Sequence, residues 1–217
     1  MASTAGAARD SLGALRKGAI VAVFSRGFSG RPRESNPDLP PGQFVTEDFP
    51  VLSAGPTPTI DTADWSFTIE TETGGRHSWD WAQLNALPIE DVHTDIHCVT
   101  RWSKFETNWR GVSLDTLFEE VESSFDFVMV HSFGGYTTNL PLEDILDGKA
   151  WIATEFAGEP LEPDHGGPAR MIVPHLYFWK SAKWVRGITM QRDDEPGFWE
   201  QNGYHIYGDP WREERYS

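Results

Sequence analysis

The sequence predicts a mixed α+β domain. Between residues 64 and 191, short segments typical of β-strands alternate with a few short segments that have the apolar spacing of helices. These segments do not follow the strand–helix–strand rhythm of a parallel α/β sheet. We therefore expect several small sheets with short helices around them.

The strands are recognised by alternating or continuous apolar residues. In "DWSFTIE", the residues Trp65, Phe67 and Ile69 alternate with polar ones, which predicts a strand with one buried face. Further strands are predicted over 90–98, 125–132, 150–161 (with a hairpin turn), 170–174 and 181–191.

Three short helices are predicted from their start and stop signals. The first covers 78–88, with Ser78 as N-cap and Pro88 as the stop, and the second covers 111–121, with Ser113 as N-cap. The third covers 141–149 and ends near Gly148. "FPVLSAGPTP", over 49–58, is expected to be irregular, as is the aromatic-rich C-terminal part.

Composition limits the class of protein. The chain has 217 residues, a formal charge of −15 and one cysteine. An acidic chain without a basic stripe is a poor ligand for nucleic acid, and no apolar run is long enough to span a membrane. A single thiol excludes an intramolecular disulfide and favours a reducing compartment, so we expect a cytoplasmic protein.

Residues 1–41 and 42–217 differ in character. Gly, Pro and charged residues are frequent in "SRGFSGRPRESNPDLPPG", which is typical of a flexible arm, so residues 1–41 are predicted to be one. Residues 42–217 are predicted to form the folded domain.

Cys98 has three interpretations from its own sequence context. It could be a small buried apolar residue, a nucleophile, or a ligand for a soft metal. The neighbouring "HTDIHC" also places His93, Asp95 and His97 on one face of the predicted strand, which is a pattern that zinc sites use. A solvated polar strand face is the simpler interpretation of that alternation.

Two other segments have the residues of an anion site. In "HGGPAR", Gly166 and Gly167 allow close backbone approach, and Arg170 carries a planar guanidinium suited to phosphate. In "KSAKW", Ser181 and Lys183 flank Ala182 and offer small residues, backbone N–H groups and an ammonium group. Two such turns are unusual in an acidic protein.

Four fragments together carry a resemblance to a known family. They are "FPVLSAGPTP", "DIHCVTRWSKFETNWRGVSLDTLF", "GGYTTNLPLEDIL" and "HGGPARMIVPHLYFWKSAKWVRGI". The chain resembles the molybdopterin-binding domain of the sulfite oxidase family from about Pro40 to its end. It is most similar to the stand-alone sulfite-oxidase-like proteins and to the catalytic subunit of the bacterial methionine sulfoxide reductase.

The resemblance implies a fold, a cofactor and ligands. It implies an α+β molybdopterin-binding fold and an oxidoreductase in which molybdenum is held by one molybdopterin and one protein thiolate. Cys98 matches the thiolate. The residues that match or stand at the family's pterin and phosphate contacts are Leu52, Ser53, Ser132, His165, Arg170, Ser181, Ala182 and Lys183.

The reaction implied is transfer of an oxygen atom to or from a small substrate, with an unknown electron-transfer partner. Arg101 and His97 are candidate pocket residues beside the metal, with Tyr136 as a weaker candidate. The arginines that bind sulfite in sulfite oxidases have no clear match. Since the family's dimer domain also has no match, we expect a monomer or a weak dimer. The alternatives are a non-catalytic molybdopterin-binding protein and a zinc protein that uses His93, Asp95 and His97.

Overall fold

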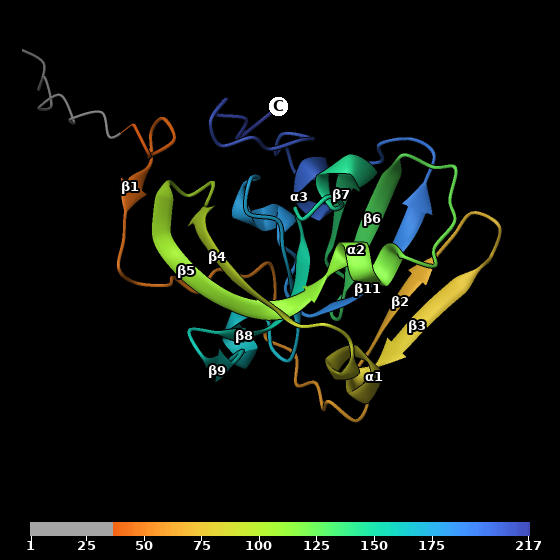
Figure 1. Cartoon of the computed structure of the whole chain (residues 1–217). Helices are drawn as coiled ribbons and strands as arrows, with labels where there is room; N and C mark the ends of the chain where they lie inside the picture. Colours follow the sequence, from red (N-terminus) through yellow and green to blue (C-terminus); the bar gives the residue numbers. More distant parts are fainter. Residues whose placement is uncertain (1–36) are drawn as a thin grey trace, which may run out of the picture. The chain divides into compact units, whose positions relative to one another are not determined.

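Two β-sheets form the framework of residues 37–217, the part of the chain that the computed structural model describes (Figure 1). The first sheet has the order β1-β5-β8-β10, with β4 paired to β5 and β9 to β8, and the second has the order β3-β2-β11-β6-β7. The β1–β5 and β2–β11 pairs are parallel and all other pairs are antiparallel. The expected mixed α+β fold with several strands and short helices is confirmed.

The elements, in chain order, are β1 (Phe44–Val45), β2 (Ser66–Glu70), β3 (Arg76–Asp80), α1 (Trp81–Ala86), β4 (Glu90–His97), β5 (Trp102–Ser113), α2 (Leu114–Phe118), β6 (Phe127–Ser132), β7 (Thr137–Pro141), the 3-10 turn η1 (Leu142–Asp144), β8 (Trp151–Phe156), β9 (Glu159–Pro160), η2 (Pro163–His165), β10 (Arg170–Ile172), η3 (Phe178–Lys180), β11 (Val185–Gln191) and α3 (Phe198–Gln201). No helix among these is long and apolar enough to cross a membrane.

The predicted helices are shorter in the structure than in the sequence analysis. The first begins at Trp81 and is capped by Asp80, whose side chain accepts from the Gln83 amide, so the prediction of Ser78 as N-cap is wrong. Ser78 instead lies in β3, where it pairs with β2. Ser113 does cap α2, which ends at Phe118, and the third predicted helix is only the 3-10 turn η1.

The strand β5 was not predicted. Its twelve residues, "WSKFETNWRGVS", form a long curved strand that pairs with β4, β1 and β8 (Figure 1). Polar residues and Gly111 interrupt its apolar pattern. At Gly111 a Cβ atom would lie 2.3 Å from the Ile152 carbonyl oxygen, so only glycine allows β8 to come this close at the bulge between the strands.

Two apolar clusters lie on this framework. The larger one contains Trp65, Phe67 and Ile69, which are all buried, as the alternation of β2 predicts. The smaller cluster gathers on the first sheet around Trp102 and Trp109, and it includes Cys98. The end of β4 is therefore inside the protein rather than on a solvated strand face.

Residues 37–217 belong to one compact unit by their contacts. The arm predicted over residues 1–41 lies, up to residue 36, outside the described residues, and its boundary with the domain stays a prediction.

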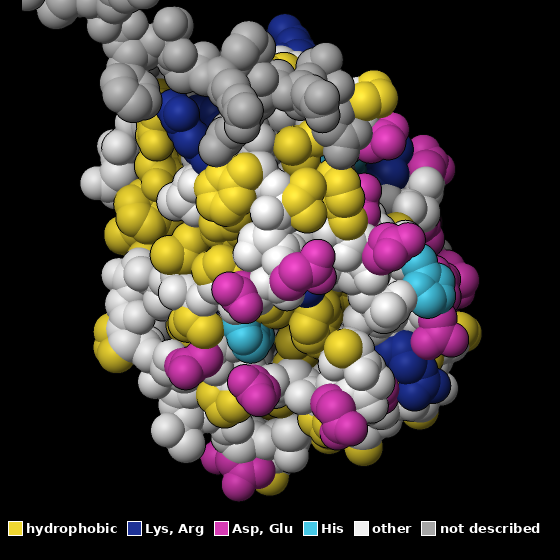
Figure 2. Space-filling model, turned by 90° about the vertical axis from the view of Figure 1, so that its left-hand side faces the viewer, with side chains coloured by type: hydrophobic (Ala, Val, Ile, Leu, Met, Phe, Trp, Pro, Cys, Tyr) yellow, Lys and Arg dark blue, Asp and Glu magenta, His cyan; other side chains and the backbone are white. Residues whose placement is uncertain are grey.

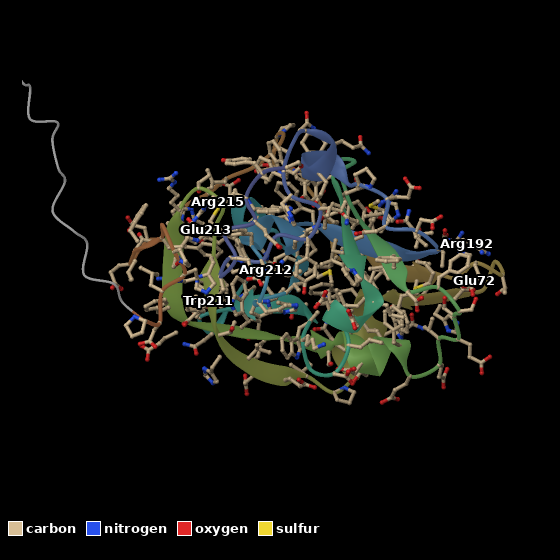
Figure 3. All side chains as sticks on the ribbon, turned by 90° about the horizontal axis from the view of Figure 1, so that it is seen from above. Glu72, Arg192, Trp211, Arg212, Glu213 and Arg215 are labelled. Carbon is tan, nitrogen blue, oxygen red and sulfur yellow. The ribbon has the colours of Figure 1, made fainter. Side chains whose placement is uncertain are left out.

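Glu72 fastens the β2–β3 turn to the loop between α2 and β6, near Arg192 (Figure 3). Its carboxylate accepts from the Ser124 amide at 2.7 Å and from the hydroxyls of Ser124 and Ser123 at 2.9 and 2.8 Å. These donors, with the Ser124 amide the largest cause, lower the pKa of Glu72 from 4.5 to about 2.

We predict that Glu72→Gln lowers thermal stability near neutral pH. A carboxylate whose folded pKa is lowered stabilises the fold above its unfolded pKa, and that contribution is lost as the pH falls toward 2. The difference in melting temperature between wild type and variant should shrink as the pH is lowered from 5 to 2. Calorimetry measures it, with the exposed Glu122→Gln on the same loop as control. A pH-independent difference would contradict the prediction.

Candidate active site

A cavity of about 430 Å³ opens among segments from both sheets. Its lining consists of Phe49, Pro50, Leu52, Ser53, Ala54, Gly55, Pro56, Cys98, Val99, Thr100, Trp102, Phe133, Gly134, Gly135, Tyr136, Arg170, Phe178, Trp179, Ser181, Ala182, Lys183, Trp184, Phe198, Trp199 and Tyr204. Its volume and its mostly apolar wall with a few polar groups are those of a site for a small molecule or a cofactor. Apart from Arg170 and Lys183, no charged residue among 37–217 lines it.

Cys98 lies at the cavity wall, directly after the end of β4. The amide of Arg101 donates to the Cys98 carbonyl at 2.9 Å, which closes a tight turn between β4 and β5. The Thr100 hydroxyl donates to the Cys98 sulfur at 3.1 Å. The side chain is 6% exposed, and burial raises the pKa of the thiol, while the Thr100 hydrogen bond and the Arg215 charge act in the opposite direction.

Arg170 begins β10 and is 1% exposed. Its Nη1 donates to the His165 carbonyl at 2.7 Å and its Nη2 to the Ser181 carbonyl at 2.8 Å. The guanidinium lies 4.2 Å from the centroid of the Phe178 ring. Burial lowers its pKa from 12.5 to about 9, which still leaves it a cation near neutral pH. No carboxylate of the described residues forms a salt bridge with this buried charge.

Lys183 places a second cation beside the first. Its Nζ donates to the Asp164 carbonyl at 2.6 Å. Burial, followed by the charge of Arg170, lowers the pKa of Lys183 from 10.5 to about 8. Gly166, at φ 109°, lets the "HGGP" turn pack against both side chains, because a Cβ there would lie 3.0 Å from the Arg170 Cβ and 3.1 Å from the Lys183 Cβ. From the sequence, we expected the backbone of this turn to lie close to a ligand. In the structure the Gly166 backbone instead packs closely against the side chains of Arg170 and Lys183.

Most of the residues singled out in the sequence are brought to this one cavity. Those that line it are Leu52, Ser53, Cys98, Tyr136, Arg170, Ser181, Ala182 and Lys183. The Tyr136 hydroxyl donates to the Trp179 carbonyl at 2.6 Å, which fixes the ring at the wall. The Ser181 hydroxyl accepts from the Val173 amide at 2.9 Å, so Ser181 also anchors the turn after β10.

Four of the predicted residues do not line the cavity. Arg101 is exposed, with a backbone φ of 78°. His97 is buried, with its Nδ1 2.8 Å from the Ser103 hydroxyl. Ser132 is buried just before the Phe133–Tyr136 part of the wall. The His165 ring stacks on Phe49 with centroids 4.0 Å apart, so it lies behind the wall.

His93, Asp95 and His97 do not form a metal site. His93 bonds to Asn108, and Asp95 accepts from the Glu106 amide at 2.8 Å. A bulge between β4 and β5 interrupts the alternation at this point. Residues 37–217 contain no group of three or more His, Cys, Asp or Glu side chains that could hold a metal ion. The zinc alternative is therefore removed.

Sequence reasoning missed the aromatic wall of the cavity. Trp102, Trp179, Trp199 and Tyr204 all line it, and the rings of Trp199 and Tyr204 are stacked with centroids 4.8 Å apart. They come from β5, η3, α3 and the chain after α3. The high aromatic content of the C-terminal part was the available signal, but it did not indicate that this irregular segment faces Cys98.

Several buried polar atoms at or beside the cavity have no hydrogen-bond partner within residues 37–217. They include Trp102 Nε1, Arg170 Nε and His165 Nδ1. Buried polar groups in folded proteins are almost always paired, so unpaired ones around a cavity indicate a polar ligand. A ligand with negative charge also supplies the counter-ion that Arg170 lacks.

Comparison with known proteins identifies the family. Residues 54–199 match the family described as the oxidoreductase molybdopterin binding domain. The chain belongs to this family. It is 41% identical to the uncharacterized oxidoreductase YuiH of Bacillus subtilis, over 88% of this chain and 98% of that protein.

Two further relatives and one solved structure agree. The chain is 24% identical to the putative protein-methionine-sulfoxide reductase subunit YedZ1 of Azospira oryzae, over 77% of this chain and 66% of that one. It is 37% identical to the mitochondrial sulfite oxidase of Drosophila melanogaster, over 75% of this chain and 34% of that one. The fold is similar to the sulfane dehydrogenase SoxCD of Paracoccus pantotrophus, with a TM-score of 0.59, 17% identity and coverage of 68% of this chain and 42% of that one.

The family assigns an activity and a cofactor: the chain is a molybdenum-dependent oxidoreductase that binds molybdopterin. The cavity fits this group. Two cations without a carboxylate partner suit its phosphate, the unpaired donors suit its polar ring, and the Cys98 thiol in the same lining suits a soft metal.

We predict that Arg170→Met and Lys183→Met lower the molybdopterin content of the purified protein. Each change removes a charge-assisted contact to a phosphate, about 1.5–3 kcal/mol, while methionine keeps an apolar side chain of similar length. Pterin fluorescence after oxidation, per folded protein, measures the content. Arg186→Met, an exposed arginine on β11, is the matched control. Equal pterin content in the double variant and the control would remove both residues from the site.

Proposed function

We propose that the enzyme transfers an oxygen atom to or from a small neutral substrate, with Cys98 as the protein ligand of molybdenum. The observation that carries the proposal is the set of charged and soft groups in the lining. One thiol, Cys98, comes from the turn after β4, and two cations, Arg170 and Lys183, come from the start of β10 and the turn before β11. The thiol suits a metal and the cations suit a phosphate.

Cys98 suits the role of metal ligand. When bound, molybdenum in its pterin supplies the redox change and the exchange of oxygen with the substrate. The protein's part is to hold a soft sulfur at a fixed position and to orient it. The closed turn 98–101 fixes the backbone, and the Thr100 hydroxyl donates a hydrogen bond to the sulfur at 3.1 Å.

The remaining lining residues are proposed to hold the pterin. Arg170 and Lys183 contact the phosphate, and Ser181 and Ala182 present the turn between them. Leu52 and Ser53 contribute backbone, because the Ser53 hydroxyl is occupied with the Gly55 carbonyl at 2.7 Å. His165 and Ser132 support the wall from behind, where His165 Nδ1 and Ser132 Oγ lack partners within the described residues.

The substrate is proposed to be neutral. Apart from Arg170 and Lys183, which are proposed to contact the phosphate, no cationic side chain of residues 37–217 lines the cavity, and Arg101, three residues after Cys98, is exposed at the surface. The protein is also acidic, and carboxylates are scattered over the face shown in Figure 2. An anion such as sulfite would be repelled on approach and unpaired in the site.

An S-oxide has no charge, and its organic groups can pack against Trp199 and Tyr204. The similarity to a putative methionine-sulfoxide reductase subunit supports this class.

We propose that the enzyme works in the cytoplasm, since a single thiol that must stay free suits a reducing compartment. A separate electron carrier exchanges electrons with the metal. A monomer or weak dimer is proposed, and light scattering tests it.

We predict that molybdenum-loaded enzyme reduces neutral S-oxides with an artificial electron donor and oxidises sulfite at least about tenfold less efficiently, as kcat/KM. Tenfold corresponds to the modest discrimination expected from one unpaired charge in a site. Measurements at low and high salt separate surface repulsion from the site's own preference. Efficient sulfite oxidation at both salt concentrations would contradict the neutral-substrate proposal.

We predict that Cys98→Ser abolishes turnover but spares most of the pterin binding. Serine keeps the size, but its hydroxyl is hard and stays protonated near neutral pH, so the metal loses a sulfur donor. The measurement is activity per bound molybdenum, with X-ray absorption counting the sulfur neighbours. If Cys98 were only packing, activity per folded molecule would survive, and wild-type turnover with an unchanged sulfur count would refute the assignment.

A further inference from the structure

Three cationic side chains are buried within residues 37–217: Arg170, Lys180 and Arg215. Lys180 pairs with the Glu200 carboxylate at 2.7 Å. Arg170 lines the cavity, where the phosphate of molybdopterin is proposed to be its counter-ion. Arg215, which is 7% exposed, forms no salt bridge with a carboxylate of the described chain. A buried charge is costly unless it is paired, so Arg215 also points to an anion.

The contacts of Arg215 lead to the Cys98 turn. Its Nη1 donates to the Val99 carbonyl at 2.8 Å, and its Nη2 donates to the Pro41 carbonyl at 3.0 Å. The guanidinium lies 4.9 Å from the centroid of the Tyr177 ring. Both Cys98 and Val99 line the cavity, whereas Arg215 does not, so Arg215 contacts the turn without entering the cavity lining. Figure 3 shows the C-terminal segment that carries it, with Trp211, Arg212 and Glu213 close by.

The Cys98 carbonyl of the same turn accepts a hydrogen bond from Gln43, a residue near the N-terminal end of the described chain. Gln43 is 3% exposed, and its Nε2 donates to the Cys98 carbonyl at 3.0 Å. Together with the Arg101 amide, these bonds fix the backbone on both sides of the sulfur. Residues from both ends of the described chain therefore converge on one four-residue turn, 98–101.

The neighbouring carboxylates of Glu213 and Glu214 form no salt bridge with Arg215. Glu214 pairs with Arg212 at 3.2 Å and with His205 at 3.5 Å. Glu213 is exposed, and within the described chain it forms no salt bridge with Arg215. Cys98, whose thiol becomes an anion when it binds a metal, directly precedes Val99, whose carbonyl accepts from Arg215.

We infer that Arg215 is a positioning residue for the metal ligand: it braces the Cys98 turn through Val99 and serves as the buried counter-ion of the Cys98 thiolate. The inference rests on the proposed role of Cys98. Groups that hold and polarise a metal ligand from behind set its orientation and donor strength, and their loss typically lowers metal affinity or activity about 10–100-fold.

The test uses the full-length, molybdenum-loaded protein with three variants. Arg215→Lys keeps the charge but not the two nitrogens that donate to separate carbonyls, and Arg215→Gln keeps a hydrogen-bond donor but not the charge. Arg212→Gln, on the same segment, is the control, because its side chain is 70% exposed and it does not contact the turn. Thermal unfolding establishes that each variant is folded. X-ray absorption then counts the sulfur neighbours of molybdenum, and the spectrum and midpoint potential of the half-reduced metal are recorded.

We expect Arg215→Gln to bind normal amounts of pterin but to show a weakened protein sulfur ligand, a midpoint potential that differs from that of wild type and about tenfold lower kcat with little change in KM. Arg215→Lys should recover most of the sulfur ligation, and Arg212→Gln should match wild type. An Arg215→Gln protein that is folded with wild-type sulfur count and potential would overturn the inference. So would a lysine variant as impaired as the glutamine variant, because the charge would then not matter.

The result separates this inference from the proposed function. If wild-type protein itself shows no sulfur ligand beyond those of the pterin, the assignment of Cys98 fails. If wild type shows that ligand and the Arg215 variants keep it unchanged, only the role of Arg215 fails.

Discussion

The buried ion pair between Lys180 and Glu200 holds together the parts of the protein that surround the cavity. Both side chains are 1% exposed, and Lys180 also donates to the carbonyls of Asn139 and Ile206. Glu200 accepts from the Trp179 indole and the Thr138 hydroxyl. These bonds join η3, β7, α3 and the chain beyond it. Because a buried charge cannot lose its partner without a large cost, the four segments are fixed relative to one another.

This arrangement has consequences for the cavity. Trp179 precedes Lys180, Ser181 follows it, and Trp199 precedes Glu200, so the ion pair sets the position of an aromatic wall and of the turn that carries Lys183. The chain beyond α3 returns to pair Tyr204 with Tyr216, which brings Arg215 beneath the Cys98 turn. The C-terminal segment is irregular in structure, but buried polar contacts define its course.

Burial gives the charges of this acidic protein different roles. Most carboxylates are exposed and determine what approaches the surface. The buried cations differ in their partners: Lys180 pairs with a protein carboxylate, Arg170 lines the cavity without one, and Arg215 donates to the Val99 carbonyl beside Cys98. A dry interior strengthens such pairs, since water does not screen them. The site thus depends on a few charges rather than on the net charge of the chain.

The sequence alone determined the mixed α+β class, the buried face of β2, the cap at Ser113 and the family with its cofactor. Those features depend on local patterns: residue alternation, a capping hydroxyl, and four fragments in order. It did not determine the strand β5, whose polar residues and Gly111 hide its period, or the capping of α1 by Asp80, since Ser78 lies in β3. For the site, it supplied Cys98, Arg170 and Lys183 as residue types. The tertiary structure decided which residues share the cavity. The irregular pairing between β4 and β5 and the positive φ of Arg101 place His97 and Arg101 outside it, and long-range burial brings Trp199, Tyr204 and Arg215 to the turn that carries Cys98.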